Sequence, residues 1–331
     1  FKKKRPLNLN KALKKIDYIV MSPGVNVNTS RHGIILKKYK KKIITDLDLI
    51  FRLKKFYKSI VVTGTNGKST TCKILYHLLK KNKYETILGG NIGTPVLNLN
   101  VQKKSFLIIE ASSFQLAYSK FISPDFAILL NITNDHLDWH GNMRNYISSK
   151  FKIFENQKRN HFSILNVKLK PLFKKRGLLS KLIIPNLKDY QKLKSSIKNS
   201  YLKSDINDEN MTNVFELSKI LKISKNSFLS SIKTFSGLPH RYEIFLKKKN
   251  YTFINDSKAT TFQATKFALK NTENIFWIVG GLPKKNDRFN FNGLQKNIIK
   301  SYIIGKKTDF FVNQLNNKIK YEIVNNIKNS I

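Results

Sequence analysis

The stretch VVTGTNGKSTTCKIL, at residues 61–75, combines residue types that bind phosphate groups. Gly64 and Gly67 permit the positive φ of a tight turn, but a turn alone does not account for Lys68, whose charge opposes the dipole of the helix that follows. A bound anion removes this conflict, because loop N–H groups and Lys68 can surround phosphates while a hydroxyl contacts Mg²⁺. The spacing between the first glycine, Gly64, and Lys68 is shorter than in the standard phosphate-loop pattern. We expect ATP to be bound here by Gly64, Thr65, Asn66, Gly67, Lys68, Ser69 and Thr70.

Further polar clusters follow apolar segments of strand length. Glu110 ends the strand-like run SFLIIE, and NITNDHLDWHGN places Asp135 and His136 after the next one. A carboxylate near a phosphate loop is a normal Mg²⁺ ligand, whereas the alternative is a set of solvated residues that cap a helix. INDSKATT and VGGLPKKND place Lys258 and Lys284 where an anionic substrate could approach the start of a helix, although each stretch could be only a turn and a cap.

From residue 59 onward, strand-like and helix-like segments alternate. Continuous apolar strands linked by helices indicate a doubly wound parallel α/β sheet, in which ligands bind at the carboxyl ends of the strands. The lysine-rich residues 167–204 are expected to form irregular connections, and FSGLPHR at 235–241 a hinge before a hairpin. The predicted helix faces are Ile74, Leu75, Leu78 and Leu79 in residues 68–82, and Tyr146, Ile147, Phe151 and Phe154 in residues 144–157.

Composition narrows the classes of function. The formal net charge is +42, which raises the alternative of a basic nucleic-acid-binding protein with an ATPase module. The positive residues are mostly lysines spread along the chain, without the clustered arginines and interleaved aromatic residues of nucleic-acid readers. We therefore expect no nucleic-acid partner. No apolar run reaches the length of a membrane span, and the single Cys72 fits a reducing cytoplasm.

In order along the chain, the motifs resemble those of the Mur ligases. The matching stretches include GTNGKST, GGNIGTP, EASSFQL, NDHLD, YISSKFKIFEN, NMTN, GLPHR, NDSKAT and GGLPKKND. GTNGKST alone marks only a superfamily that includes the folylpolyglutamate synthases. SSFQL, GLPHR and NDSKAT together resemble the members that add D-glutamate to UDP-N-acetylmuramoyl-L-alanine. The resemblance implies an ATP-dependent, ADP-forming ligase of peptidoglycan precursor synthesis that acts as a monomer through an acyl phosphate.

The resemblance also implies domains and residue roles. Residues 1–52 would be a remnant of an N-terminal UDP-binding domain, 53–238 a P-loop-type ATP-binding domain, and 239–331 an incomplete, Rossmann-like amino-acid-binding domain. The implied catalytic residues are Lys68, Glu110, His136 and Lys150. Two Mg²⁺ ions would be held by Ser69, Glu110, His136 and a carbamylated Lys150. Further nucleotide contacts would come from Asn210, Asn213, Arg241 and Asp256, and contacts to the other substrates from Asn91, Ser112, Gln115, Lys258, Thr260 and Lys284.

Lys150 and Lys152 lie on the same expected helix. Lys150 is one turn from the apolar stripe, so we expect it to point toward the ligand edge of the sheet and Lys152 to point to solvent. The chain departs from the family at Glu209, where His is common, and at Val167 and Lys168, which replace an Asp pair. Because the chain is expected to lack both ends of the family's length, a nucleotide-binding fragment without turnover is an alternative, as is a folylpolyglutamate synthase-like enzyme.

Overall fold

The computed structural model describes residues 8–53, 55–283, 287–324 and 326–330. The chain forms two compact units, Phe1–Phe235 and Ser236–Ile331. The first unit is built on a six-stranded parallel sheet with strand order β4-β5-β3-β6-β7-β8. The strands are β3 (Lys58–Thr63), β4 (Thr86–Gly90), β5 (Phe106–Glu110), β6 (Phe126–Leu129), β7 (Phe162–Leu165) and β8 (Lys181–Ile183). The expected doubly wound parallel sheet is confirmed.

The register of the central strands explains why the polar clusters meet. Val62 on β3 pairs with Glu110 on β5, and Thr63 pairs with Leu129 on β6. The loop after β3, the end of β5 and the exit of β6 therefore share the carboxyl edge of the sheet. The strands β5 and β6 are wholly buried, as expected when helices cover a parallel sheet on both sides.

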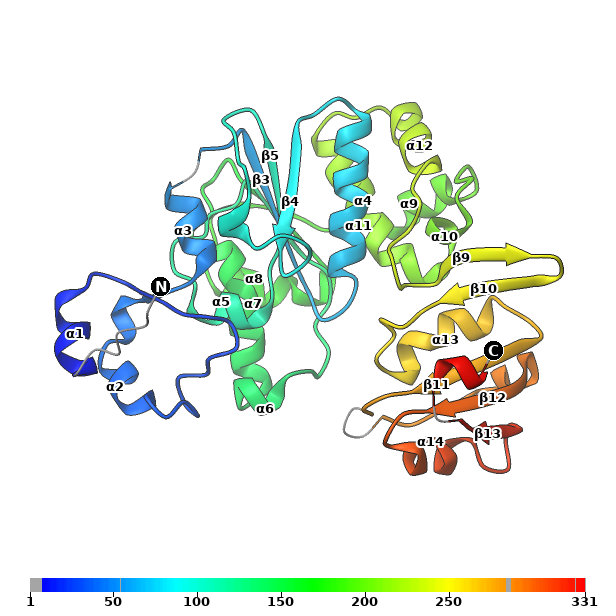
Figure 1. Ribbon diagram of the computed structural model, residues 1–331. Coiled ribbons are helices and arrows are strands. Elements are labelled where there is room, and N and C mark those ends of the chain that lie inside the picture. The colour runs from blue at the N-terminus through cyan, green and yellow to red at the C-terminus, as the bar shows by residue number, and fades with distance from the viewer. Residues whose placement is uncertain (1–7, 54, 284–286, 325, 331) are drawn as a thin grey trace. The chain divides into compact units, whose positions relative to one another are not determined.

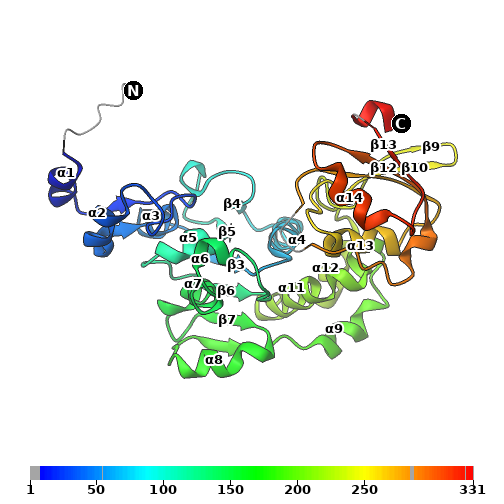
Figure 2. The ribbon, with the colours of Figure 1, turned by 90° about the horizontal axis from the view of Figure 1, so that it is seen from below.

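Helices cover both faces of this sheet. Figure 2 shows α4 (Lys68–Lys81) and α11 (Asp208–Ile220) on one side of β3 and β6, with α5 (Ser113–Tyr118) and α7 (Met143–Glu155) on the other. The predicted inner face of α4 is confirmed, because all four of its expected apolar residues are buried. The stripe of α7 is confirmed too, with Tyr146, Phe151 and Phe154 buried and Ile147 packed against the core. The remaining helices of this sheet region are α6 (Leu137–His140), α8 (Lys170–Lys175), α9 (Leu187–Lys194), α10 (Ser200–Lys203) and α12 (Lys225–Lys233).

The expectation of irregular structure over residues 167–204 is wrong. This segment contains α8, the edge strand β8, α9 and α10. Asn186 and Asn199 cap α9 and α10 by accepting backbone N–H groups, while few apolar residues, such as Tyr190 and Leu193, anchor α9. Short helices with lysine-rich outer faces give weak periodicity, and β8 has only three residues, so neither signal stands out in the sequence.

The N-terminal residues of the first unit form α1 (Leu9–Lys15), β1 (Ile19–Val20), α2 (Gly33–Lys38), β2 (Ile43–Ile44) and α3 (Asp46–Leu53). β1 and β2 pair in parallel over a small core that includes Leu13, Met21 and Val27. This segment is tied to the sheet region, since the backbone N–H of Val27 donates to the Tyr118 hydroxyl at 2.9 Å. Its division from the central domain at residue 52 stays a prediction.

The second unit is smaller (Figure 1). An antiparallel hairpin, β9 (Glu243–Lys248) with β10 (Tyr251–Asn255), follows the expected hinge and confirms the predicted hairpin. A parallel sheet of β11 (Ile275–Gly280), β12 (Ile298–Ile304) and β13 (Tyr321–Ile323) is accompanied by α13 (Phe262–Lys270) and α14 (Thr308–Leu315). Phe262, Phe289 and Phe291 cluster in its core. A parallel sheet in which α13 precedes β11 and α14 links β12 to β13 agrees with the expected Rossmann-like class.

Candidate active site

The phosphate loop turns sharply between β3 and α4. Gly67 has φ +83°, and a Cβ at this position would overlap the side-chain oxygen of Asn210, so both the backbone and the space require glycine. The Lys68 ammonium donates to the carbonyl oxygens of Gly64 at 3.0 Å and Thr65 at 2.9 Å. The Lys68 side chain is therefore folded back over the loop. To contact a phosphate it would leave these two carbonyls.

Lys150 reaches the same loop from α7. The residue is 1% exposed, its Nζ donates to the Gly64 carbonyl at 2.7 Å, and that nitrogen lies 4.6 Å from the ring centre of Tyr146. Burial and then the charge of Lys68 lower the pKa of Lys150 to about 7, although Asp135 acts in the opposite direction. The expected direction of Lys150, toward the ligand edge of the sheet, is confirmed. A large share of this amine is neutral near neutral pH.

A cavity of about 80 Å³ brings the loop together with the ends of β4, β5 and β6. Seven of the residues expected to act in the site line it. They are Gly64, Thr65, Lys68, Asn91, Ser112, His136 and Lys150. Asp135, Ser113, Phe114 and Tyr146 complete the lining. The structure therefore brings these seven expected residues together around one cavity, and their roles in binding and catalysis stay predictions.

Glu110, the last residue of β5, contacts Asn91 of the cavity lining. Its Oε1 accepts a hydrogen bond from the Asn91 side chain at 2.7 Å, and its buried Oε2 has no hydrogen-bond partner within the described part of the chain. A buried carboxylate oxygen without a donor fits a hard cation such as Mg²⁺. The described residues contain no cluster of three or more His, Cys, Asp and Glu side chains able to hold a metal, so any such ion would need hydroxyl, phosphate or modified-lysine oxygens as well.

Two histidines on the exit of β6 differ in environment. His136 adopts φ +54° before α6, lines the cavity and lies 3.4 Å from the Asp135 carboxylate. His140 is buried, and its ring bonds the Ser113 hydroxyl at 3.0 Å. Burial, followed by the charges of His136 and Lys150, lowers the pKa of His140 to about 4. His140 is therefore a neutral structural residue, while His136 has access to the site.

Several expected contact residues use their polar atoms inside the protein. The Gln115 side-chain oxygen accepts from the backbone N–H and hydroxyl of Ser112, and the Ser112 hydroxyl accepts from the Gln115 backbone N–H, which makes a capping box at the start of α5. The Gln115 side-chain nitrogen donates to Asp46. Gln115 thereby fixes the position of Ser112, which lines the cavity.

Asn210 and Asn213 are similarly engaged at the start of α11. Asn210 accepts from the Thr71 hydroxyl at 3.2 Å and donates to Asn207, and Asn213 donates to the Glu209 carbonyl at 2.8 Å. The side-chain oxygen of Asn213 is buried without a hydrogen-bond partner among the described residues. In this arrangement Asn210 braces the phosphate loop, while Asn213 keeps an unused acceptor.

Five of the expected residues, Arg241, Asp256, Lys258, Thr260 and Lys284, lie in the second unit. Asp256 accepts from the backbone N–H of Tyr242 at 2.9 Å, and burial raises the pKa of its carboxyl. Arg241 has a buried Nε with no hydrogen-bond partner in the described ranges. Lys258 and Thr260 are exposed just before α13, and Lys284 lies outside the described residues. The grouping of these residues with the first unit stays a prediction.

The expectation that Lys152 points to solvent is wrong. Its Nζ donates to the carbonyl oxygens of Ala117 and Ser119 at 3.1 and 3.0 Å, and burial lowers its pKa. These carbonyls lie at the end of α5, where a cation satisfies acceptors that the helix leaves unpaired. Lys152 therefore ties α7 to α5 rather than extending into water.

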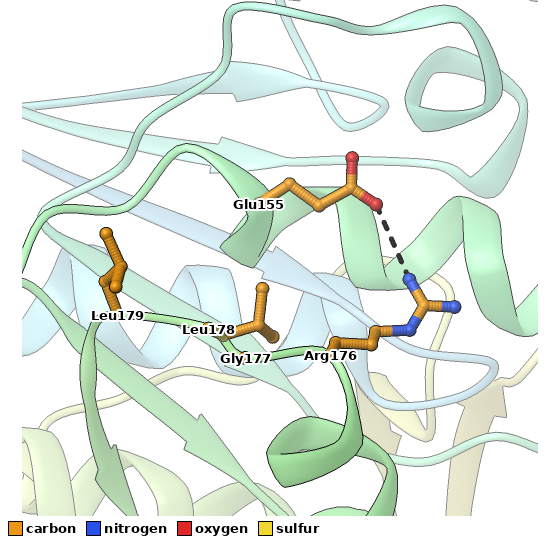
Figure 3. Close-up of a pocket in the computed structure, with 5 residues that line it drawn as sticks. All are labelled: Glu155, Arg176, Gly177, Leu178 and Leu179. Atoms are coloured by element: carbon orange, nitrogen blue, oxygen red, sulfur yellow. Dashed lines mark hydrogen bonds and ion pairs between the residues drawn. The ribbon is translucent and has the colours of Figure 1, made fainter.

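A larger hollow of about 490 Å³ lies elsewhere, lined by Glu155, Arg176, Gly177, Leu178 and Leu179. Figure 3 shows the ion pair between Arg176 and Glu155, whose atoms are 3.4 Å apart. Leu179 precedes β8, so this hollow is at the amino edge of the sheet, opposite the phosphate loop. Ligands of doubly wound sheets bind at the carboxyl edge of the sheet. We therefore assign the chemistry to the cavity beside the phosphate loop, although that cavity is the smaller of the two.

Comparison with known proteins agrees with this geometry. Residues 62–220 match the model of the Mur ligase middle domain. The chain is 32% identical over 333 residues to a Rickettsia felis protein named UDP-N-acetylmuramoylalanine–D-glutamate ligase, covering 95% of this chain and 74% of that protein. A Francisella tularensis subsp. novicida protein of the same name is 33% identical, with 97% of this chain and 77% of the relative covered. The chain belongs to the Mur ligase family.

Solved structures of other Mur ligases share the fold. MurF from Thermotoga maritima in complex with ADP has a TM-score of 0.61 at 17% identity, covering 94% of this chain and 89% of that one. MurC from the same organism has a TM-score of 0.62 at 19% identity, with 94% and 77% covered. No helix in the described part of this Mur ligase is long and apolar enough to cross a membrane.

Sequence reasoning did not single out Asn131, which contacts the phosphate loop. Its carbonyl and side chain both bond the phosphate loop, at Thr65 and Asn66 respectively. The available signal was its position directly after the buried strand FAILL, at the edge where the other polar clusters lie.

Proposed function

We propose that this chain is an ATP-dependent ligase that joins D-glutamate to UDP-N-acetylmuramoyl-L-alanine in the cytoplasm, as a step in making peptidoglycan precursors. The activity in the names of its 32–33% identical relatives supports the substrates. The structural observation that carries the proposal is the convergence of Lys68 and Lys150 on the carbonyl of Gly64, inside a cavity at the carboxyl edge of the sheet.

The reaction needs positive charge at this point because two anions must meet. In the first step, a carboxylate oxygen of the alanyl group forms a bond to the γ-phosphorus of ATP, and the bond from that phosphorus to the β–γ bridging oxygen breaks, releasing ADP. Lys68, at the start of α4, can move from the loop carbonyls to the terminal phosphate, where its charge offsets the repulsion between the two reactants.

In the second step, the amine of D-glutamate attacks the acyl phosphate. A C–N bond forms, the C–O bond to phosphate breaks, and inorganic phosphate leaves while a proton leaves the nitrogen. We assign recognition of the two glutamate carboxylates to Lys258, Thr260 and Lys284, and of the muramoyl-alanine end to Asn91 and Ser112. Asn91 is oriented for this by its bond to Glu110.

The donor set fits Mg²⁺ because Glu110 keeps a buried oxygen without a hydrogen-bond partner among the described residues. We assign one ion to Ser69 and Glu110 and a second to His136 and a carbamylated Lys150. Bound Mg²⁺ would neutralise charge on the phosphates. With its pKa near 7, Lys150 is available as a neutral amine. Its lone pair can attack CO₂, forming an N–C bond and opening one C=O π bond, after which a proton leaves to solvent and a carbamate anion remains.

The test is release of phosphate by purified protein supplied with ATP, Mg²⁺, UDP-N-acetylmuramoyl-L-alanine and D-glutamate, together with the mass of the product. We expect release to require all three substrates, and L-glutamate or D-alanine to substitute poorly. Equal turnover with other amino acids would contradict the assigned substrate. Turnover with a folate and L-glutamate instead would favour the folylpolyglutamate synthase alternative.

A further inference from the structure

The phosphate loop is held from outside by Asn131, at the exit of β6. The Thr65 N–H donates to the Asn131 carbonyl at 2.9 Å, and the Asn66 N–H donates to the Asn131 side-chain oxygen at 2.8 Å. The Asn131 side-chain nitrogen donates back to the Asn66 carbonyl at 3.3 Å. Two consecutive residues of the loop are thus fixed by one asparagine.

The same nitrogen also donates to Glu209 Oε2 at 2.6 Å. An amide can rotate by half a turn and exchange its oxygen for its nitrogen, but an ionised carboxylate only accepts hydrogen bonds. Glu209 therefore favours the same orientation as the Asn66 backbone, with the Asn131 nitrogen facing α11 and the oxygen facing the Asn66 N–H. The reversed amide would place two donors against each other at Asn66.

Asn210, the next residue of α11, holds the other side of the loop. Its side-chain oxygen accepts from Thr71 and leaves no room for a Cβ on Gly67. At the start of α11, Glu209 thus acts on one side of the loop through Asn131, and Asn210 contacts the other side directly at Gly67. The arrangement is a clamp made of Asn131, Glu209 and Asn210.

We propose that Glu209 is a positioning residue for ATP: by fixing the Asn131 amide it holds the phosphate loop in the conformation that receives the nucleotide. The proposal rests on the ATP-dependent function proposed above. It assigns a role to a position where the sequence departs from the family's common His. Glu209 acts through hydrogen bonding and does not touch the reacting atoms, so its loss should affect ATP affinity far more than the chemical step.

The test compares four variants and one control variant in ADP titrations and in steady-state kinetics. Glu209→Ala should weaken ADP binding and raise the KM for ATP about tenfold with kcat changed less than about threefold, as expected for one charged hydrogen bond. Glu209→Gln keeps an acceptor oxygen and should remain within about twofold of the parent chain. Asn131→Asp sets two carboxylates against each other and should weaken binding more than Glu209→Ala.

The decisive variant combines Asn131→Asp with Glu209→Gln. The introduced carboxylate still accepts from the Asn66 N–H, and the introduced amide can donate to it, so the double variant should bind ADP more tightly than Asn131→Asp alone. Glu216→Ala is the matched control, because it removes a carboxylate from α11 that pairs with Lys219 on the same helix, and it should leave binding unchanged.

The outcomes separate the two proposals. Unchanged or tighter ADP binding in Glu209→Ala, or no rescue in the double variant, would overturn the role of Glu209 even if the parent chain ligates D-glutamate. Failure of the parent chain to ligate while it binds ADP would overturn the proposed function, and the binding data would still decide the role of Glu209. If Glu209→Ala lowered the thermal midpoint, and kcat fell by about as much as KM rose, the effect would be merely structural. That result would also overturn the role of Glu209.

Discussion

Lys68 and Lys150 donate hydrogen bonds to the same carbonyl oxygen, that of Gly64, at 3.0 and 2.7 Å. Two ammonium groups on one acceptor repel each other, and this repulsion contributes to the lowered pKa of Lys150. The loop therefore holds both lysines close to where a terminal phosphate would bind. An anion bound beside Lys68 would relieve the repulsion, and so would loss of the positive charge on Lys150. Anion binding at Lys68 is therefore linked to the charge of Lys150.

Lys68→Ala should abolish ATP-dependent phosphate release. The variant loses the charge that would neutralise the transferring phosphoryl group, an effect that we expect to exceed about a thousandfold in kcat by comparison with other phosphoryl-transfer sites. Because the Lys68 ammonium bonds two carbonyls of the loop, far-UV circular dichroism should stay unchanged. Normal turnover in this variant would contradict the assignment of the loop.

Lys150→Ala should nearly eliminate ligation and spare nucleotide binding. The buried Nζ faces the cavity and is the expected site of the carbamate, whereas ADP would depend chiefly on the loop and α4. Turnover at saturating ATP and ADP titration check the two halves of this prediction. Arg144→Ala, which removes an exposed cation from the same helix, is the control and should change neither. Partial recovery of the alanine variant by added short-chain carboxylic acids would support a carbamate over an ammonium.

Lys150 should also give the chain a distinct pH dependence of stability. Its pKa is about 7 in the folded state, against about 10.4 when unfolded, so between these values the unfolded chain binds more protons and stability rises with pH. Lys150→Met removes this contribution. In urea denaturation without CO₂ or metal, the advantage of Lys150→Met over the parent chain should shrink by about 2 kcal/mol from pH 7 to pH 9. A difference independent of pH would mean that the buried lysine titrates normally.

Part of this site follows from the sequence because parallel strands share an edge. Glu110 ends one recognisable buried strand and His136 comes after the next one. The register pairs Glu110 with Val62 of β3, and His136 lines the same cavity as the loop after β3. The direction of Lys150 follows from its distance to the apolar stripe. Such reasoning needs only local periodicity and a common sheet edge.

Other features depend on contacts between distant segments. Lys152 sits on the same helix as Lys150, yet carbonyls at the end of α5 capture it, and nothing in its own neighbourhood signals this. The bond from Asn131 to Glu209 joins residues 78 positions apart. Neither propensity nor periodicity encodes the partner of a single polar side chain, so these contacts required the structure.

Selectivity for the amino acid should depend on the second unit. Lys258→Ala and Lys284→Ala should each raise the KM for D-glutamate about tenfold or more while the KM for ATP changes little, since each would remove a charged partner of a glutamate carboxylate. Lys258 is exposed beside the start of α13, which suits contact with a small anion. Lys270→Ala, at the far end of α13, serves as the control. Equal effects on both KM values would show that the lysines act only through the general positive field.

Gly67→Ala should cost far more function than stability. Gly67 and Gly177 both have positive φ, +83° and +60°, so an added Cβ strains the backbone at either position by about 1 kcal/mol. Only at Gly67 does that Cβ also collide with Asn210, whereas nothing lies within 4 Å of it at Gly177. Comparing the two variants separates backbone strain from displacement of the clamp. The unfolding free energy should fall in both variants, by at most about 2 kcal/mol more in Gly67→Ala than in Gly177→Ala. ADP binding should be lost in Gly67→Ala alone. Equal ADP affinities in the two variants would show that the contact between Gly67 and Asn210 does not set the nucleotide site.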